Sequence, residues 1–197
     1  MPQFDLRNMK CAAYTNNNGS VSYGTINSMG DAMTANLELR FAEARLYAES
    51  TLAEYLRKAI GGTISVGVKY IPTATQKVLF GSSDKTRSVG TGTGSSITGL
   101  NMTAKDVQGT VGVAFYAPDM VDGEEKYTCV FIPRCRFGQP SMSLQTLGET
   151  IQFNTPTING EFLADHTSSQ NMLEVAVVDT AAKAAAWCTV VLGGTAS

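Results

Sequence analysis

The amino-acid sequence predicts a mainly β protein, a β-sandwich or barrel of about eight strands decorated by short α-helices. Three observations carry this prediction: strict alternation of apolar and polar residues, turn residues between the alternating segments, and helical patterns that are all short. The chain has 197 residues, a length that can bury one sizeable core. We therefore expect a single domain that spans residues 1–197.

The clearest strands have a period of two, which places every second residue on the same face. Apolar residues occupy alternate positions in Met33–Phe41, Ile64–Tyr70 and Val111–Phe115, with polar or small residues between them. The turn signal Asp122-Gly123 joins the third segment to a return strand, so these two strands form a predicted hairpin. One face of the return strand is expected to carry Tyr127, Cys129, Phe131, Cys135 and Phe137.

Weaker patterns predict the remaining strands. The segment KCAAYTNNNGSVSYG is expected to form a hairpin around Asn18-Gly19, and MLEVAVV and WCTVVL supply two more strands. A further strand is expected within GETIQFNTPTINGEFL, residues 148–163, where the apolar phase slips at Pro156. Such a strand either bends between two sheets or carries an ordinary bulge at a sheet corner.

Three short segments have helical signals. In STLAEYLRKAIGG, Ser50 is the expected cap and Gly61 the stop. The apolar stripe of this helix would consist of Leu52, Tyr55, Leu56 and Ala59. PTATQKVLFG has Pro72 at its start, and DTAAKAAAW has Asp179 as its cap.

Residues 82–105 match no predicted element. They are rich in glycine, serine and threonine and show no apolar period. A loop of this length within a compact domain is usually functional or disordered. We therefore predict a long Gly/Ser/Thr-rich loop at 82–105.

Composition limits the class of protein. Charged residues make up only 16 % of the chain and the net charge is −2, which favours a surface covered by oligomer contacts, although polar loops would give the same composition. The N-terminus lacks the apolar core of a signal peptide, and no apolar run approaches about 18 residues. We expect a protein made in the cytosol without membrane insertion.

The sequence contains no convincing metal or catalytic site. With one histidine in the chain, a zinc site would need at least three of the four cysteines, which form no CxxC pair, so free and mostly buried thiols are expected. The glycine-rich GTGTGSS lacks the strand, helix and lysine of a phosphate-binding loop. His166 stands near Ser168 and Ser169 without a nucleophile elbow. Glu124 and Glu125 follow a turn, where charge is solvated.

These observations predict no catalytic residue, no cofactor and no metal, so an enzyme is not expected. Arg134 and Arg136 share a strand face but stand alone in a net acidic chain, which argues against a nucleic-acid-binding patch. A monomeric sugar- or ligand-binding sandwich would need exposed aromatic residues in a groove, whereas Trp187 lies in a predicted strand where burial is expected.

The ordered set of segments resembles the major tail proteins of long-tailed bacteriophages, which are the subunits of the tail tube. The resemblance extends from about Asn8 to Leu163, most of the chain. Its parts are the opening hairpin, the elements RLYA, LFG and GVAFYA, the strand from Tyr127 to Pro140, and the most characteristic segment IQFNTPTINGEF. The long loop at 82–105 and the pair Cys129 and Cys135 depart from the family pattern.

The resemblance implies a tail-tube type of β-sandwich with one or two short flanking α-helices. It implies a structural virion protein that self-assembles into stacked, hexameric rings, which form the tube through which DNA is ejected into the host. Implied partners are further copies of the chain, the tape measure, tail terminator and distal tail proteins, and passing DNA without specific binding. The implied location is the virion tail, and the host cytoplasm during assembly. The alternative is a tube subunit of a contractile, phage-tail-like injection machine.

Two surfaces are expected to serve such a tube. Because DNA must slide, the lumen should present hydroxyl, amide and acidic groups rather than clustered cations. The candidate lumen-facing residues are Thr34, Asn36 and Glu38, or Gln152 and Asn154. The loop at 82–105 is expected to join one ring to the next, unless it is a disordered decoration. Its candidate inter-ring residues are Gly90, Gly92, Gly94, Ile97, Leu100 and Met102.

Overall fold

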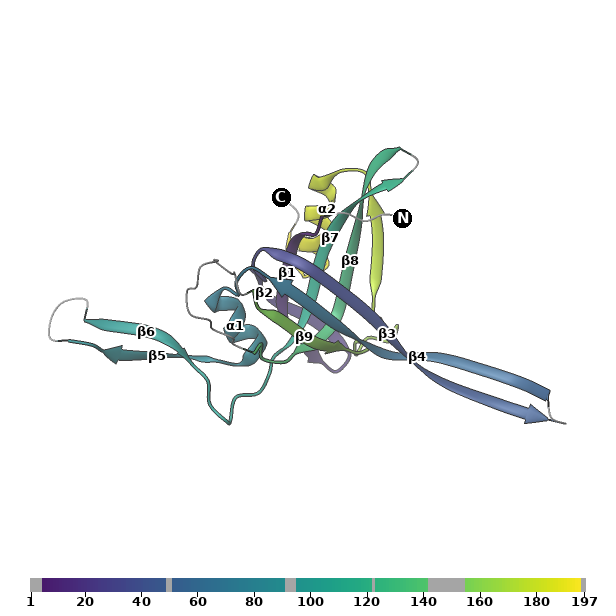
Figure 1. Ribbon diagram of the computed structural model, residues 1–197, viewed down its shortest axis with the longest axis horizontal. Helices are drawn as coiled ribbons and strands as arrows, with labels where there is room; N and C mark the ends of the chain where they lie inside the picture. Colours follow the sequence, from purple (N-terminus) through teal and green to yellow (C-terminus); the bar gives the residue numbers. More distant parts are fainter. Residues whose placement is uncertain (1–4, 49–50, 91–94, 122, 142–154, 196–197) are drawn as a thin grey trace, which may run out of the picture.

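The computed structural model describes residues 5–48, 51–90, 95–121, 123–141 and 155–195. Within these ranges the protein is mainly β with short helices (Figure 1). The strands are β1 Arg7–Asn17, β2 Ser20–Ser28, β3 Ala32–Ala48, β4 Thr51–Val68, β5 Ser83–Ser88, β6 Ser96–Asn101, β7 Thr110–Val121, β8 Glu124–Phe137, β9 Thr157–Phe162 and β10 Glu174–Val178. The helices are α1 Thr73–Phe80 and α2 Ala181–Val190.

One antiparallel sheet of eight strands dominates the fold. Its order is β2-β1-β7-β8-β9-β4-β3, and β10 also pairs with β8, while β5 and β6 form a separate hairpin. These findings confirm the predicted mainly β class and the approximate number of strands. The predicted hairpin at Asn18-Gly19 is also confirmed, because both residues have positive φ, as a type I′ turn requires.

The main core lies inside the curvature of this sheet. Side chains from both ends of the strand order meet in one cluster, which requires the sheet to curl around it. Helix α1 closes the cluster with Leu79 and Phe80. The largest fully buried members from the strands are Met9, Ile64, Val66, Val68, Ile132, Phe137, Ile158 and Phe162.

A second core lies on the opposite face of β1, β7 and β8, under helix α2. Ala184 and Cys188 of the helix pack there with Leu192, and the ring of Trp187 meets Phe131 edge-on at 6.4 Å between centroids. The predicted strand WCTVVL is therefore wrong, because its first residues continue α2. The cap is Thr180, whose side chain accepts a hydrogen bond from the Lys183 amide at 3.3 Å, one residue after the predicted Asp179.

Strand β8 changes face halfway along its length, so the prediction of a single apolar face is wrong. Cys129 and Phe131 contact the second core, whereas Cys135 and Phe137 contact the main core. A β-bulge opposite β7 produces this change, because the single residue Gly112 of β7 lies opposite Pro133 and Arg134 of β8. Beyond the bulge β8 also changes partner, from β10 to β9, and Pro133 lies between the two pairings. Proline has no backbone donor, so this break leaves no amide unpaired there.

The predicted helix at 50–61 is wrong, because residues from Thr51 onward belong to strand β4. The helix would have presented its apolar stripe to no core, whereas β4 pairs with β3 along almost its whole length. Tertiary pairing therefore overrides the helix propensity of leucine, alanine, glutamate, lysine and arginine. The expected cap Ser50 lies outside the described residues, as do Ile151 and Phe153, so the phase slip before Pro156 stays a prediction.

Helix α1 confirms the prediction for PTATQKVLFG. Pro72 occupies the N-cap, and Gly81 ends the helix in the left-handed conformation at φ 71°, with its amide bonded to the Lys77 carbonyl at 3.0 Å. By contrast, the prediction that residues 82–105 match no element is wrong. They contain the hairpin β5–β6, in which the Thr86 and Thr98 hydroxyl groups are 2.8 Å apart. Strand pairing satisfies the backbone there without a core.

Candidate assembly surfaces

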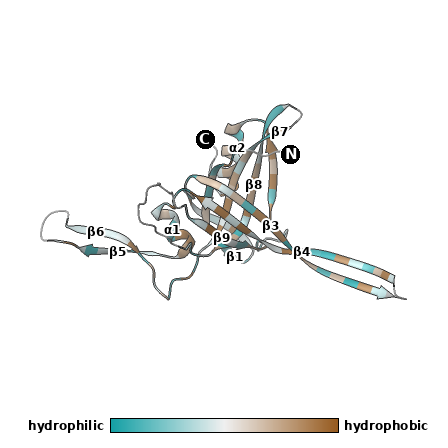
Figure 2. Ribbon diagram, in the orientation of Figure 1, coloured by the Kyte–Doolittle hydropathy of each residue, from teal (hydrophilic) through white to brown (hydrophobic). Residues whose placement is uncertain are grey.

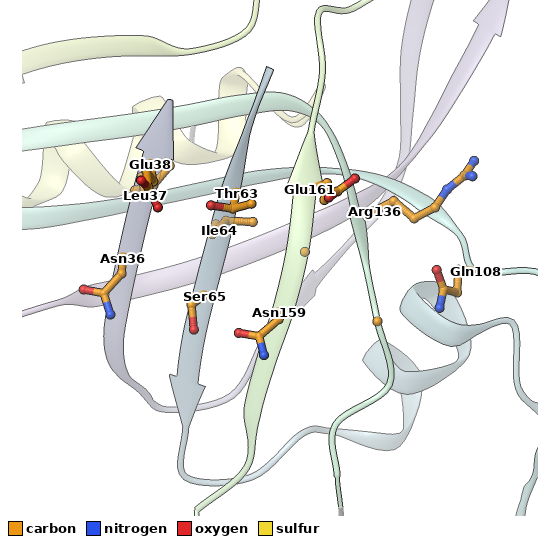
Figure 3. Close-up of a pocket in the computed structure, with 12 residues that line it drawn as sticks. Asn36, Leu37, Glu38, Thr63, Ile64, Ser65, Gln108, Arg136, Asn159 and Glu161 are labelled. Atoms are coloured by element: carbon orange, nitrogen blue, oxygen red, sulfur yellow. The ribbon is translucent and has the colours of Figure 1, made fainter. Parts of the chain in front are cut away.

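Polar side chains form rows across β3, β4 and β9 on the sheet face that points away from the main core (Figure 3). Strand register brings residues of the same chemical type side by side. The hydroxyl row is Thr34 and Thr157 on either side of Gly67, the amide row is Asn36 and Asn159 on either side of Ser65, and the carboxylate row is Glu38 and Glu161 on either side of Thr63. We call this surface the polar rows.

The polar rows form part of a hollow of about 830 Å³. Gly138 and Gly160 contribute backbone to its lining, and Gln108 and Arg136 lie at its border (Figure 3). Glu161 accepts a hydrogen bond from Arg40 at 3.1 Å. Arg136 instead donates to the Thr110 hydroxyl at 3.0 Å. The hollow can therefore hold polar or ionic groups, but the described part of its lining offers no aromatic side chain for stacking a sugar or base.

The predicted lumen-facing residues are only partly described. Thr34, Asn36 and Glu38 lie on the polar face of β3, and the last two line the hollow. Gln152 and Asn154 lie outside the described residues. Sequence reasoning missed the contribution of β9, because Asn159 and Glu161 belong to the face only through the register of β9 with β4.

A two-stranded ribbon, residues 41–48 and 51–60 of β3 and β4, projects from the body; we call it the long arm (Figure 1). It begins where β9 ends, since Phe162 pairs with Gly62 and no residue of β9 pairs beyond that point. Its side chains are nearly all exposed, and apolar residues alternate with polar ones along it (Figure 2). The exposed large apolar residues are Phe41, Leu46, Tyr47, Leu52, Tyr55, Leu56 and Ile60.

One face of the long arm is cross-linked by its own side chains. Arg57 lies over the Phe41 ring at 3.9 Å from the centroid and within 3.3 Å of Glu43. Glu43 also contacts Arg45 at 3.4 Å, and Arg45 lies over the Tyr55 ring at 5.6 Å. Cation–π contacts and ion pairs of this kind stabilise a ribbon that has no third strand.

Among the described residues, the opposite face of the long arm has no such cation–π contacts or ion pairs. Register places Leu46 opposite Glu54 and Ala44 opposite Leu56 on this face. Ala42 comes next, opposite Lys58, so the face also carries a cation at the end near the body. These side chains contain small and large apolar groups that remain in water. This apolar face of the long arm is therefore available to another surface.

A second ribbon, residues 83–90 and 95–101, projects from the body beside α1; we call it the short arm (Figure 1). An ion pair at its base joins Lys77 to Asp84 at 2.7 Å. Of the predicted inter-ring residues, Ile97 and Met102 are exposed and Leu100 is half-buried. Gly90 lies near the tip, and Gly92 and Gly94 lie outside the described residues.

The described titratable groups include four buried thiols and a fully buried carboxylate, Asp119, which has no hydrogen-bond partner among the described residues. All four thiols are buried, as predicted, and burial raises the pKa of Cys129 to about 11 and of Cys11 and Cys188 to about 12; burial also raises the pKa of Cys135. Such thiols carry little thiolate at neutral pH. His166 Nδ1 is 2.9 Å from the Tyr14 hydroxyl, which also accepts the His166 amide hydrogen.

Within the described ranges, no group of three or more histidine, cysteine, aspartate or glutamate residues is arranged to hold a metal ion. Neither helix in the part of the chain that the structure describes is long and apolar enough to span a membrane. No family model matches the chain, and no curated protein matches it significantly.

Proposed function

We propose that this chain is a structural virion protein that self-assembles into stacked, hexameric rings of a phage tail tube, through which DNA passes to the host. In this proposal the curled sheet and its two cores form a tail-tube type of sandwich. The tape measure, tail terminator and distal tail proteins are the expected neighbours of the assembled tube.

The long arm is the observation that carries this proposal. An isolated two-stranded ribbon is marginally stable in water, yet this one extends well beyond the body and exposes a series of large apolar side chains. Monomeric proteins rarely leave a continuous apolar surface exposed. A subunit that buries the arm against other copies accounts for both its length and its composition.

The polar rows support passage of DNA rather than tight binding of it. Hydroxyl and amide groups make up two of the three rows, and the third carries Glu38 and Glu161. Arg40 is held by Glu161, so one cation beside the rows is already neutralised. Each free lysine or arginine on a lining would add a salt-dependent attraction to phosphate. Among the described residues beside the rows, Arg136 follows Glu161 in register and donates to the Thr110 hydroxyl rather than to a carboxylate, so it remains available for such an attraction.

Purified protein tests the proposal directly. Sedimentation velocity across a wide concentration range should show growth from the 20.9 kDa subunit to large particles, and negative-stain electron microscopy should show rings or tubes with a central channel. A strictly monomeric profile at high concentration and low salt, with dispersed single particles on the grid, would refute the proposal.

A further inference from the structure

The two arms project in opposite directions from the body (Figure 1). An object with different projections at its two ends can associate head to tail, because one end of each copy meets the other end of the next. Whether the arms themselves meet depends on their surfaces.

The short arm carries a notch with a positively charged rim. Strand register places Lys85 opposite Gly99 and Arg87 opposite Ile97 on one face. A Cβ on Gly99 would meet nothing within 4 Å, so the ribbon is open at this point. The resulting hollow of about 240 Å³ is also lined by Val89. This volume is below the range of about 300–1,000 Å³ of small-molecule sites, and suits one or two side chains.

The rim of this notch is available for pairing. Lys85 and Arg87 are exposed, and neither has an ion-pair partner among the residues that the structure describes. The notch itself contains Ile97 and Val89, both largely exposed. Its ideal occupant is therefore an apolar side chain accompanied by a carboxylate.

The tip of the long arm has this combination. Leu46 and Glu54 are directly opposed on the apolar face, and Leu56 lies on the same face. Glu54 is exposed and has no ion-pair partner in the described ranges. The cross-linked face of the same arm differs, because its carboxylate, Glu43, is already held by Arg45 and Arg57.

We propose that the tip of the long arm of one copy docks on the short arm of the next copy, with Leu46 and Leu56 against the notch and Glu54 between Lys85 and Arg87. This contact rests on the proposed function, because it supplies the connection between successive subunits. The contact joins two preformed hairpins whose faces match in shape and charge.

Charge reversal and mixing test the contact. Glu54→Lys gives a positive long arm that faces a positive short arm, and Lys85→Glu/Arg87→Glu gives a negative short arm that faces a negative long arm. Each variant alone should need at least about tenfold more protein to assemble. An equimolar mixture of the two should assemble as the unmodified protein does, since opposite charges then meet at every contact. Normal assembly by either variant alone, or failure of the mixture, would overturn the proposal.

A matched control separates this effect from net charge. Lys183→Glu reverses an exposed charge on α2, outside both arms, and should leave assembly unchanged.

Cross-linking gives a second, independent readout. The native thiols are buried, so a chain that carries Glu54→Cys and Arg87→Cys should react with a short thiol-specific cross-linker only at these two positions. Assembled protein should give a ladder of covalently linked copies. If the double-cysteine chain forms rings or tubes but gives no ladder of linked copies, the arm contact is refuted and the tube proposal stands. If the unmodified protein forms neither rings nor tubes, the tube proposal itself is refuted. Efficient linkage of Arg87→Cys to Glu38→Cys instead would show that the short arm occupies the hollow at the polar rows, and would also overturn the proposal.

Discussion

Replacing Leu46 and Leu56 by serine should weaken assembly strongly without affecting the fold of the subunit. The two side chains are 58 % and 69 % exposed in the free chain, and neither belongs to the main or the second core. Substitutions at such exposed positions usually change the free energy of unfolding by less than about 0.5 kcal/mol. The isolated subunit should therefore unfold at nearly the same denaturant concentration as the unmodified chain.

The expected loss of assembly follows from the apolar surface that remains exposed. Complete burial of a leucine side chain contributes about 1.5–3 kcal/mol. More than half of each side chain is still exposed, so each contact loses about 1–2 kcal/mol, and the pair loses about 2–4 kcal/mol. Since about 1.4 kcal/mol corresponds to a factor of ten, the concentration needed for assembly should rise by about 30- to 1,000-fold.

Sedimentation velocity at a series of protein concentrations measures this change, and urea unfolding of the same samples measures the stability of the subunit. Val175→Ser serves as the control, because Val175 is a comparably exposed apolar residue on β10 and outside the arms. If the double variant assembles at the same concentration as the unmodified protein, the apolar face of the long arm is not an assembly surface. A large loss of subunit stability would show that the arm is part of the folding unit.

Three further predictions concern the subunit itself. Phe162→Ala removes a fully buried ring and should lower stability by about 3–5 kcal/mol, or about 10 °C in Tm by calorimetry; an unchanged Tm would contradict the described core. Thr180→Ala removes the cap of α2 and should reduce the free energy of unfolding by about 1 kcal/mol, with Thr180→Ser as the control. Burial raises the pKa of Cys11 to about 12, whereas an unfolded thiol ionises at about pH 8.5. The Cys11 contribution to stability should therefore be complete below about pH 8.5 and fall above it by up to about 1.4 kcal/mol per pH unit, and Cys11→Ala should remove that share of the slope.

Local chemistry made part of the fold predictable. Asn18 and Gly19 both tolerate positive φ, so the first hairpin is determined by two adjacent residues. Pro72 and Gly81 define the ends of α1 in the same way. The strand that starts at Thr51 could not be predicted from its own residues, because these residues favour a helix in isolation. They form a strand by pairing with β3, and no local pattern in the sequence reveals how long β3 is.

The residues of the candidate surfaces were predictable only where the pattern within a single strand determines which face a residue occupies. Asn36 and Glu38 lie on the polar face because alternation along β3 determines it. Their neighbours Asn159 and Glu161 depend on the register between β9 and β4, which is a property of the pair. The short arm was missed for a related reason, since a hairpin exposed on both faces needs no apolar period. Threonines on facing strands, such as Thr86 and Thr98, were the available signal.

The even-numbered face of β3 links the two candidate surfaces. Over the body this face is polar, with Asn36 and Glu38. At Arg40, where an ion pair to Glu161 joins β3 to the end of β9, the character changes, and the same face continues into the long arm through Ala42 to Leu46. Strand β9, which pairs with the other side of β4, ends at this point. A face of β3 that remained in water along its whole length would have no reason to become apolar there. Under the proposed assembly, the change has a reason: the face meets solvent over the body, and a neighbouring copy would cover it over the arm.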